Sequence, residues 1–144
     1  MAIQQISVFL ENRPGTLKKM TGVLAEHSID LRATSLAETK DFGIARLIVD
    51  DAMSAVNTLK EHDFVASLTP VLAIEIPDVA GGLDKLLEAF DNENVNIEYM
   101  YAFPGGKDIN TAGMIFRVAD TKAAEARLVG KGVKILNQED IANI

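Results

Sequence analysis

The residues best suited to chemistry form one short stretch, Glu11-Asn12-Arg13-Pro14-Gly15-Thr16-Leu17, between an extended apolar run and an amphipathic helical pattern. Pro14 suits the first turn of a helix, because it has no N–H group and a preset φ angle. Gly15 has no Cβ and lets a ligand approach the backbone closely. Free N–H groups at a helix start, with the positive end of the helix dipole, can bind a carboxylate without Lys or Arg. The stretch therefore predicts either a small-molecule anion site at a strand-to-helix corner or a loop that only turns the chain.

A second corner of the same kind is Asp78-Val79-Ala80-Gly81-Gly82-Leu83, which also joins an extended run to an apolar helical pattern. Gly81 lies 66 positions after Gly15. Apolar residues coincide at the same offset, in the pairs Leu17 and Leu83, Met20 and Leu86, Leu24 and Phe90, Ile29 and Val95, and Leu31 and Ile97. Further along, Gly43 matches Gly113 at an offset of 70, which gives the second copy four extra residues. A long period that occurs twice predicts a duplicated domain, since a solenoid needs three or more repeats.

Apolar periodicity predicts the elements that position the first corner. Alternating apolar and polar residues predict strands over residues 3–10, 29–34, 44–49 and 64–68. Helical spacing predicts two helices, over residues 17–27 and 52–59. Asp50 or Asp51 is placed to cap the second helix, because an aspartate side chain can accept from its free N–H groups. The predicted order is therefore strand, helix, strand, strand, helix, strand.

The second copy begins at Pro70, since proline is tolerated at strand ends but not in the middle of a hydrogen-bonded ladder. Its predicted strands cover residues 72–76, 95–103, 114–118 and 133–136. Its predicted helices cover residues 83–90 and the segment from Asp120 or Thr121 to Leu128. Residues 104–108 are predicted to form a hairpin loop that contains most of the insertion. Residues 141–144 are expected to be a frayed or docked tail.

Both corners, with the segments that follow them, resemble a known family. Glu11–Leu17, which reads ENRPGTL, is followed by a helix and then by Ser28–Leu31, and this combination resembles an ACT domain. The second copy, with Asn94–Glu98 after its helix, resembles one too. It has Ala80 in place of the proline and Asp78 in place of the asparagine. ACT domains are βαββαβ modules that bind amino acids and regulate metabolic enzymes, and the two copies cover nearly the whole chain.

The resemblance implies an α+β fold of two ferredoxin-like βαββαβ domains, residues 1–69 and residues 70–144. Modules of about 70 residues are marginally stable alone. We therefore expect them to share a core or an extended sheet. The resemblance implies antiparallel sheets joined side by side, with the helices on one face, which would also cover exposed strand edges. Homodimerisation through helices or sheets is a further expectation.

Composition and charge exclude several classes of function. The net charge of −7 disfavours nucleic acids and anionic membranes, because both require basic patches. The absence of cysteine excludes disulfides, thiol catalysis and cysteine-based zinc sites. The N-terminus has no signal-peptide pattern, and no stretch reaches the ~18 apolar residues of a membrane span. We therefore expect a cytoplasmic protein.

No residue pattern predicts catalysis, a metal site or a cofactor site. His27 and His62 lie near predicted helix ends without a Ser or Cys partner motif, and are expected to be surface or helix-terminal residues. Residues 80–82 and 104–106 are Gly-rich but lack the Lys-Ser/Thr of a phosphate loop. An aromatic stripe over residues 99–103 could stack an RNA base, but the acidic charge favours packing in the core or in a ligand pocket.

We therefore predict a non-catalytic regulatory protein that binds a free L-amino acid. Two other classes remain open, a ligand-free interaction module that regulates an enzyme of amino-acid metabolism and a small enzyme on the ferredoxin-like fold. In ACT domains the amino acid lies between paired units. One unit provides the strand-to-helix corner, and the other provides a residue at the start of its second strand.

Transferred to this chain, the resemblance implies two sites. The first contains Leu10, Asn12, Arg13, Pro14, Gly15, Thr16 and Leu17 of one unit with Asn96, Ile97, Glu98 and Tyr99 of the other. The second contains Asp78, Val79, Ala80, Gly81, Gly82 and Leu83 with Asp30 and Leu31. Asn12 and Asn96 offer donors and acceptors to a carboxylate and an ammonium group, so we predict that the first site binds the ligand. Asp78 and Asp30 would repel a carboxylate, so the second site is expected to be weaker. Glu98, Tyr99 and Tyr101 lie on the adjacent strand and favour a ligand with an aromatic or imidazole side chain.

Overall fold

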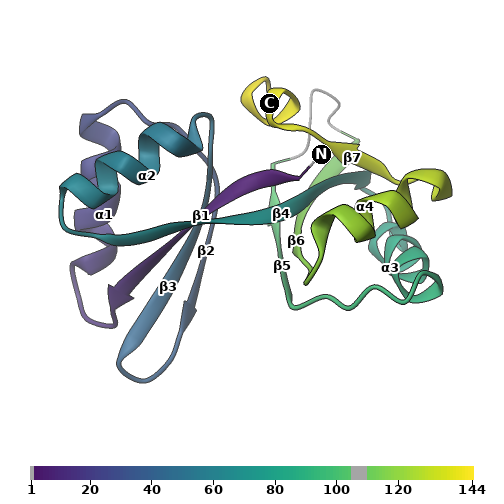
Figure 1. Cartoon of the computed structure of the whole chain (residues 1–144), viewed down its shortest axis with the longest axis horizontal. Coiled ribbons are helices and arrows are strands. Elements are labelled where there is room, and N and C mark those ends of the chain that lie inside the picture. Colours follow the sequence, from purple (N-terminus) through teal and green to yellow (C-terminus); the bar gives the residue numbers. More distant parts are fainter. Residues whose placement is uncertain (1, 105–109) are drawn as a thin grey trace. The chain divides into compact units, whose positions relative to one another are not determined.

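The computed structural model describes residues 2–104 and 110–144 of the 144-residue chain (Figure 1). The backbone divides into two compact units, which we term the first unit (Gln4–Thr69) and the second unit (Pro70–Ile144, together with residues 2–3). Each unit combines an antiparallel sheet with helices. This confirms the predicted α+β class and the pair of βαββαβ modules.

The first unit contains six elements. They are β1 (Ile3–Glu11), α1 (Thr16–Glu26), β2 (Leu31–Glu38), β3 (Phe42–Val49), α2 (Ala52–Glu61) and the start of β4 (Val65–Pro77). The strand order is β2-β3-β1-β4, and β3 pairs antiparallel with both β1 and β2. α1 and α2 contact one another and pack on the same face of this sheet (Figure 1). The arrangement is the ferredoxin-like topology that the order of elements predicts.

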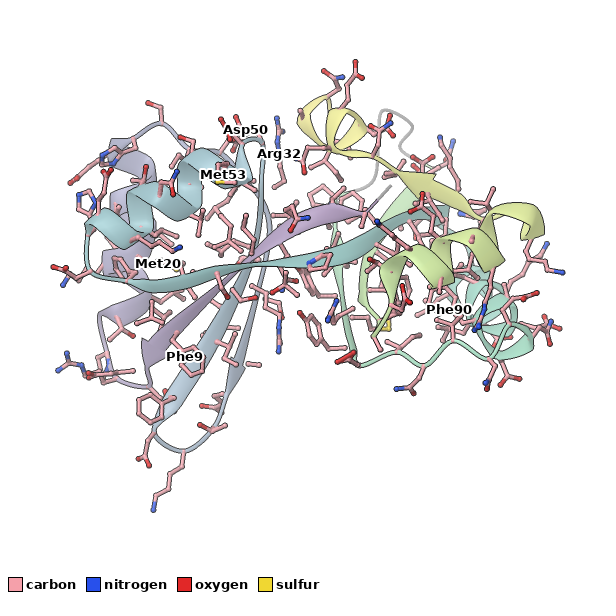
Figure 2. All side chains as sticks on the ribbon, viewed as in Figure 1. Phe9, Met20, Arg32, Asp50, Met53 and Phe90 are labelled. Atoms are coloured by element: carbon pink, nitrogen blue, oxygen red, sulfur yellow. The ribbon has the colours of Figure 1, made fainter. Side chains whose placement is uncertain are left out.

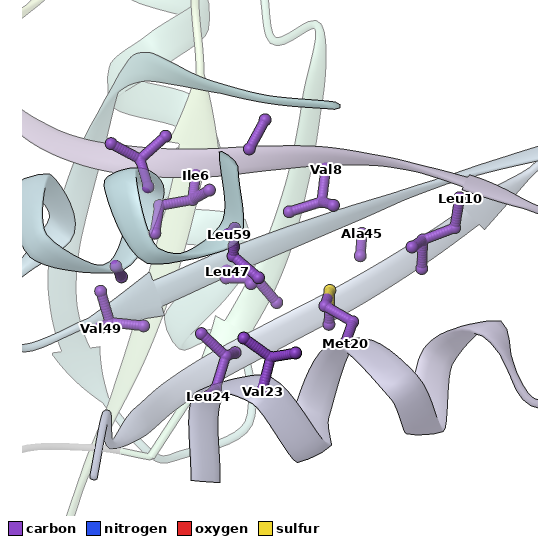
Figure 3. Close-up of a cluster of buried hydrophobic side chains, with 13 residues drawn as sticks. Ile6, Val8, Leu10, Met20, Val23, Leu24, Ala45, Leu47, Val49 and Leu59 are labelled. Carbon is purple, nitrogen blue, oxygen red and sulfur yellow. The ribbon is translucent and has the colours of Figure 1, made fainter. Parts of the chain in front are cut away.

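The core of the first unit follows from strand alternation, which turns every second residue of β1 and β3 toward the helices. Its buried members are Ile6, Val8, Leu10, Met20, Val23, Leu24, Ala45, Leu47, Val49, Ala55, Val56, Leu59 and Ala66 (Figure 3). Strand pairing sets Val8 opposite Ala45 and Ile6 opposite Leu47, so the inward-facing rows coincide. Burying a large apolar side chain contributes about 1.5–3 kcal/mol. This core therefore fixes β1 and α1, the two elements that flank the first corner.

The second unit repeats the topology. After the rest of β4 it contains α3 (Gly82–Asn92), β5 (Tyr99–Phe103), β6 (Thr111–Arg117), α4 (Thr121–Leu128), a 3₁₀ turn (Val129–Lys131), β7 (Lys134–Leu136) and α5 (Gln138–Ala142). The strand order is β5-β6-β4-β7, and all neighbours are antiparallel. Its own core includes the rings of Phe90 and Phe116, whose centres lie 4.8 Å apart.

The structure corrects the alignment of the two copies. Asp51 and Asp120 are the N-caps of α2 and α4, and each carboxylate accepts from a backbone N–H three residues later. These two caps lie 69 positions apart, so the second copy has three extra residues. The predicted offset of 70, with Gly43 matched to Gly113, is therefore wrong. Because Asp50 and Asp51 are adjacent aspartates, the sequence alone is compatible with an offset of either 69 or 70. Only the geometry of the N-caps distinguishes the two offsets.

Strands β2 and β5 begin later than predicted, at residues 31 and 99 instead of 29 and 95. After α1 and α3 the chain reverses through Ser28 and Asn94, which both have φ of 55°. The N–H of the next residue then bonds to the carbonyl oxygen five residues earlier, at 3.0 Å in the first unit and 2.9 Å in the second. This C-terminal capping motif, present after both helices, includes residues that were predicted to begin the next strand.

β4 runs without interruption from Val65 to Pro77, although two strands separated at Pro70 were predicted. Pro70 precedes the first residue pair between β4 and β6, Leu72 with Phe116, so its missing N–H leaves no gap in that ladder. Its carbonyl group accepts from Arg117 Nη1 at 2.9 Å.

The C-terminal segment contains the short helix α5, where a frayed or docked tail was expected. Asn137 caps this helix, and its side chain and that of Asp140 each bond to the other residue's N–H. Such a capping box has a sequence signature that could have predicted the helix. The hairpin loop predicted at residues 104–108 lies largely outside the described residues. None of the described helices has the length and apolar composition needed to cross a bilayer.

Candidate functional site

The first corner contains a four-residue turn, Arg13–Thr16, that leads directly into α1. The Thr16 N–H donates to the Arg13 carbonyl at 3.5 Å, and Gly15 has φ 90° and ψ −13°. Proline at the second position and a left-handed glycine at the third are the signature of a type II turn. α1 therefore begins at Thr16, and the prediction that Pro14 lies in its first helical turn is wrong, because the left-handed Gly15 separates the two.

The start of α1 offers three backbone donors. The N–H groups of Gly15, Leu17 and Lys18 donate to no acceptor among the described residues, whereas the N–H of Lys19 bonds to the Gly15 carbonyl at 3.0 Å. α1 has no side-chain hydrogen bond at its N-cap and no acidic residue in its first turn. Nothing in the first turn therefore neutralises the positive end of the dipole, and the corner favours an anion.

Thr16 and Arg13 hold the corner in shape. The Thr16 hydroxyl donates to the carbonyl groups of Glu11 and Arg13, at 2.8 and 3.1 Å. These bonds tie the end of β1 to the first residue of α1. The Arg13 guanidinium pairs with the Glu11 carboxylate at 2.8 Å, and both groups are exposed. Thr16 and Arg13, both predicted site residues, thus have hydrogen-bond or ion-pair partners within the corner itself.

A cavity of about 380 Å³, which we term the first-corner cavity, opens between this corner and β2. The register of three strands sets Leu10, Gly43 and Glu38 in one row. Gly43 contributes no side chain to this row, and the Leu36 side chain lies beside it, since a Cβ at Gly43 would be 3.4 Å from Leu36 Cδ1. Leu17 of α1 and Leu36 of β2 add apolar walls. The volume lies within the range of small-molecule pockets, about 300–1,000 Å³.

Two carboxylates line this cavity, and Glu38 is the one that is not paired with Arg13. Asn12 Nδ2 donates to the Glu38 carboxylate at 3.0 Å and to the carbonyl groups of Thr39 and Lys40 at 3.3 and 3.4 Å. The donor side of Asn12 is thereby committed to the β2–β3 turn, and only Oδ1 is left to accept from a ligand. Sequence reasoning did not select Glu38, since only the strand register brings it beside the corner. The available signal was an acidic residue before the predicted turn that ends at Gly43.

The second corner has the same backbone geometry. Gly81 has φ 84° and ψ −4°, the Gly82 N–H donates to the Val79 carbonyl at 3.0 Å, and the Lys85 N–H bonds to the Gly81 carbonyl at 3.0 Å. The start of α3 lies closer to the end of β4 here than the start of α1 lies to the end of β1 in the first corner. A Cβ at Gly82 would come within 2.5 Å of the Pro77 carbonyl oxygen, so this position requires glycine.

The side chains around the second corner differ from those around the first. At the structural offsets, Asp78, Pro104 and Ala112 occupy the places of Asn12, Glu38 and Gly43. A carboxylate thus replaces the amide at the corner, no acid corresponds to Glu38, and Ala112 adds a methyl group that Gly43 lacks. The backbone donors are repeated in both corners, but the amide of Asn12 and the carboxylate of Glu38 are not.

The predicted partner residues of the second unit lie at the start of β5 and in the connection before it. Ile97 packs against the core of that unit, and the Glu98 N–H bonds to the Arg117 carbonyl at 2.9 Å. Tyr99 is the first residue of β5, and Asn96 precedes the strand. The prediction that Asn96 and its neighbours complete the site at the first corner stays a prediction.

The predicted residues before β2 have partners within the first unit. The Asp30 carboxylate pairs with Arg32 at 3.4 Å, and Leu31 packs against the core. Their expected pairing with the second corner also stays a prediction. The structure therefore brings together Leu10 and the segment Asn12–Leu17, and it adds Glu38 to that set.

The two histidines end the two helices of the first unit, as expected for helix-terminal residues. His27 and His62 are the C-caps of α1 and α2, and each Nδ1 lies 2.9 Å from the carbonyl oxygen four residues earlier. Their ring centres are 5.1 Å apart. Within residues 2–104 and 110–144, no group of three or more His, Asp or Glu side chains is arranged to hold a metal ion.

Comparison with known proteins agrees with this geometry. The structure is similar to a crystal structure of protein BT0572 from Bacteroides thetaiotaomicron, with 38% identity, a TM-score of 0.92, and coverage of 100% of this chain and 98% of that one. It is also similar to the ligand-free regulatory subunit of aspartate kinase from Thermus thermophilus, with 20% identity, a TM-score of 0.64, and coverage of 90% and 92%. No curated protein matches significantly. All of residues 1–144 match the family model of the ACT domain pair, and the chain therefore belongs to this family.

Proposed function

We propose that this ACT domain pair is a non-catalytic regulatory protein that binds a free amino acid in the first-corner cavity. One observation carries the proposal: a cavity with a carboxylate and apolar walls adjoins a helix start that has unpaired backbone N–H groups, and Leu17 belongs to both. Every amino acid zwitterion presents a carboxylate, an ammonium group and a side chain. The cavity and this helix start together offer a complementary group for each of the three.

The ligand carboxylate would accept from the N–H groups of Gly15, Leu17 and Lys18, where the helix dipole adds a favourable field. The ligand ammonium would donate to the Glu38 carboxylate and to Asn12 Oδ1, which form a charge-assisted site. Its side chain would then lie among the leucines of the cavity.

The regulatory part of the proposal is supported by the family and by fold-level similarity. Two structural neighbours are regulatory subunits of aspartate kinase, from Thermus thermophilus and Thermus flavus. By analogy, the protein partner would be a metabolic enzyme whose activity changes when the amino acid binds. Differential affinity of the ligand for two states of the complex would carry that signal.

Thermal unfolding in the presence of each of the twenty amino acids tests the proposal. A ligand that binds only the folded state stabilises it, by about 2.7 kcal/mol at a concentration one hundred times its Kd. We expect a few amino acids to raise the Tm at millimolar concentration. The N-acetyl form and the amide of the same amino acid should have little effect, since each lacks one charge of the zwitterion. If no amino acid changes the Tm, the chain is instead a ligand-free interaction module.

A further inference from the structure

The first unit has a second cavity, of about 580 Å³, on the β4 side of the first corner. Its apolar walls come from β1, β3 and the segment that enters β4, and we term it the Phe9 cavity. The wall residues are Phe9, Phe42, Phe64 and Val65. Phe9, Phe42 and Val65 are 54%, 52% and 69% exposed, and Phe9 projects from the end of β1 (Figure 2). Such a concentration of exposed apolar surface marks an interaction or ligand site more often than a bare surface.

The second unit serves as an internal control for this cavity. The same place in that unit holds a cavity of about 600 Å³, where Glu75 and Lys134 correspond to Phe9 and Val65. These two residues are paired across β4 and β7, and Lys134 Nζ lies 3.1 Å from Glu75 Oε1. The alignment is supported by Asp63 and its counterpart Gly132, which have φ of 66° and 75°. The fold thus accepts an ion pair at these positions and does not require Phe9 or Val65 to be apolar.

The charges at the rim of the Phe9 cavity leave one cation and one anion unpaired. Arg13 and Glu11 pair with each other at 2.8 Å. Lys19 and Asp63 have no ion-pair partner among the described residues. Lys19 Nζ lies 6.0 Å from the centre of the Phe64 ring, so its charge lies beside the aromatic wall. A lysine also lines the cavity of the second unit, at position 85.

We propose that the Phe9 cavity is a second ligand site, for a free aromatic amino acid. Lys19 faces the ligand carboxylate, Asp63 faces its ammonium, and the aromatic side chain packs against Phe9 and Phe42. The equal charges at the rim select a zwitterion over a pure anion or cation. Aromatic rings gain about 0.5–1.5 kcal/mol beyond their buried area when they pack on one another, which favours an aromatic ligand over an aliphatic one. The inference deepens the proposed amino-acid binding and rests on it, but it concerns a different cavity.

The chain contains no tryptophan, so the fluorescence of L-tryptophan, excited at a wavelength where the two tyrosines do not absorb, reports binding. We expect a blue shift of the ligand emission and a rise in its anisotropy on titration with the full chain. Tryptamine, indole-3-propionate and N-acetyl-tryptophanamide each lack one or both charges, and should bind at least tenfold more weakly. If any of them binds as tightly as L-tryptophan, the cavity does not recognise a zwitterion and the proposal is overturned.

The double substitution Phe9→Glu with Val65→Lys installs the ion pair that the second unit already contains, so folding should be preserved. Circular dichroism and the unfolding midpoint check this. We expect the double variant to lose L-tryptophan binding at least tenfold, whereas Glu61→Gln, on the exposed end of α2, should change it less than twofold. If Glu38→Gln loses the binding and the double variant keeps it, the Phe9 cavity is not the site and the proposed function survives. If no amino acid binds in either assay, the proposed function fails as well.

Discussion

At the scale of single residues, Glu38 decides whether the first corner binds an amino acid or only an anion. Glu38→Gln keeps the size of the side chain and an oxygen that can accept from Asn12, but removes the charge. A hydrogen bond to a charged group contributes about 1.5–3 kcal/mol, so we expect binding of the amino acid to weaken roughly tenfold to a hundredfold. Isothermal calorimetry measures this loss. Glu61→Gln, on the exposed end of α2, is the matched control, and equal affinities for both variants would exclude a role for Glu38.

The sequence was sufficient to locate the first corner but not to assign its side chains. Pro14 and Gly15 favour one turn type by local sterics, and a turn needs no information from the rest of the chain. The neighbourhood of Glu38 depends on how three strands are registered, which only packing of the whole unit determines. Asn12 was correctly placed at the corner, but its donor hydrogens are used by the β2–β3 turn.

At the scale of elements, the left-handed Gly15 sets the start of α1. Gly15→Ala places a Cβ in a conformation with φ 90°, and we expect it to lower the free energy of unfolding by about 1–2 kcal/mol. Gly22→Ala in the interior of the same helix is the control, where alanine should instead stabilise the fold by about 0.5–1 kcal/mol. A Cβ at Gly22 meets only the end of the Lys18 side chain, at 3.6 Å. Urea unfolding measures both changes, and a stabilising Gly15→Ala would contradict the turn assignment.

The elements were predictable where local patterns agree with packing. Strand alternation and helical spacing identified every strand and helix of the first unit, since its inner faces are regularly apolar. The starts of β2 and β5 were predicted too early, because the helices before them end with left-handed residues, Ser28 and Asn94, directly after their C-caps, and apolar periodicity does not reveal such residues. The prediction divided β4 at Pro70, because a proline in the middle of a hydrogen-bonded ladder is disfavoured. In the structure Pro70 lies just outside the β4–β6 ladder, so the strand continues.

At the scale of the whole molecule, each unit has its own core but few residues to stabilise it. A cut between Thr69 and Pro70 also divides β4. We therefore expect the fragments 1–69 and 70–144 to be poorly folded or to self-associate when each is expressed alone. Light scattering and urea unfolding test this against the full chain. Two monomeric fragments with cooperative unfolding would show that neither unit needs the other.

The central claim is that the first corner, and not its structural repeat, binds the amino acid. The most direct test is an NMR titration of the ¹⁵N-labelled full chain with the amino acid that raises the Tm most. The account predicts the largest amide shifts at Gly15, Leu17 and Lys18, whose N–H groups would donate to the ligand carboxylate. The equivalent amides of Gly81, Leu83 and Asp84 are the built-in control and should move little. Larger shifts at the second corner, or equal shifts at both, would contradict the account.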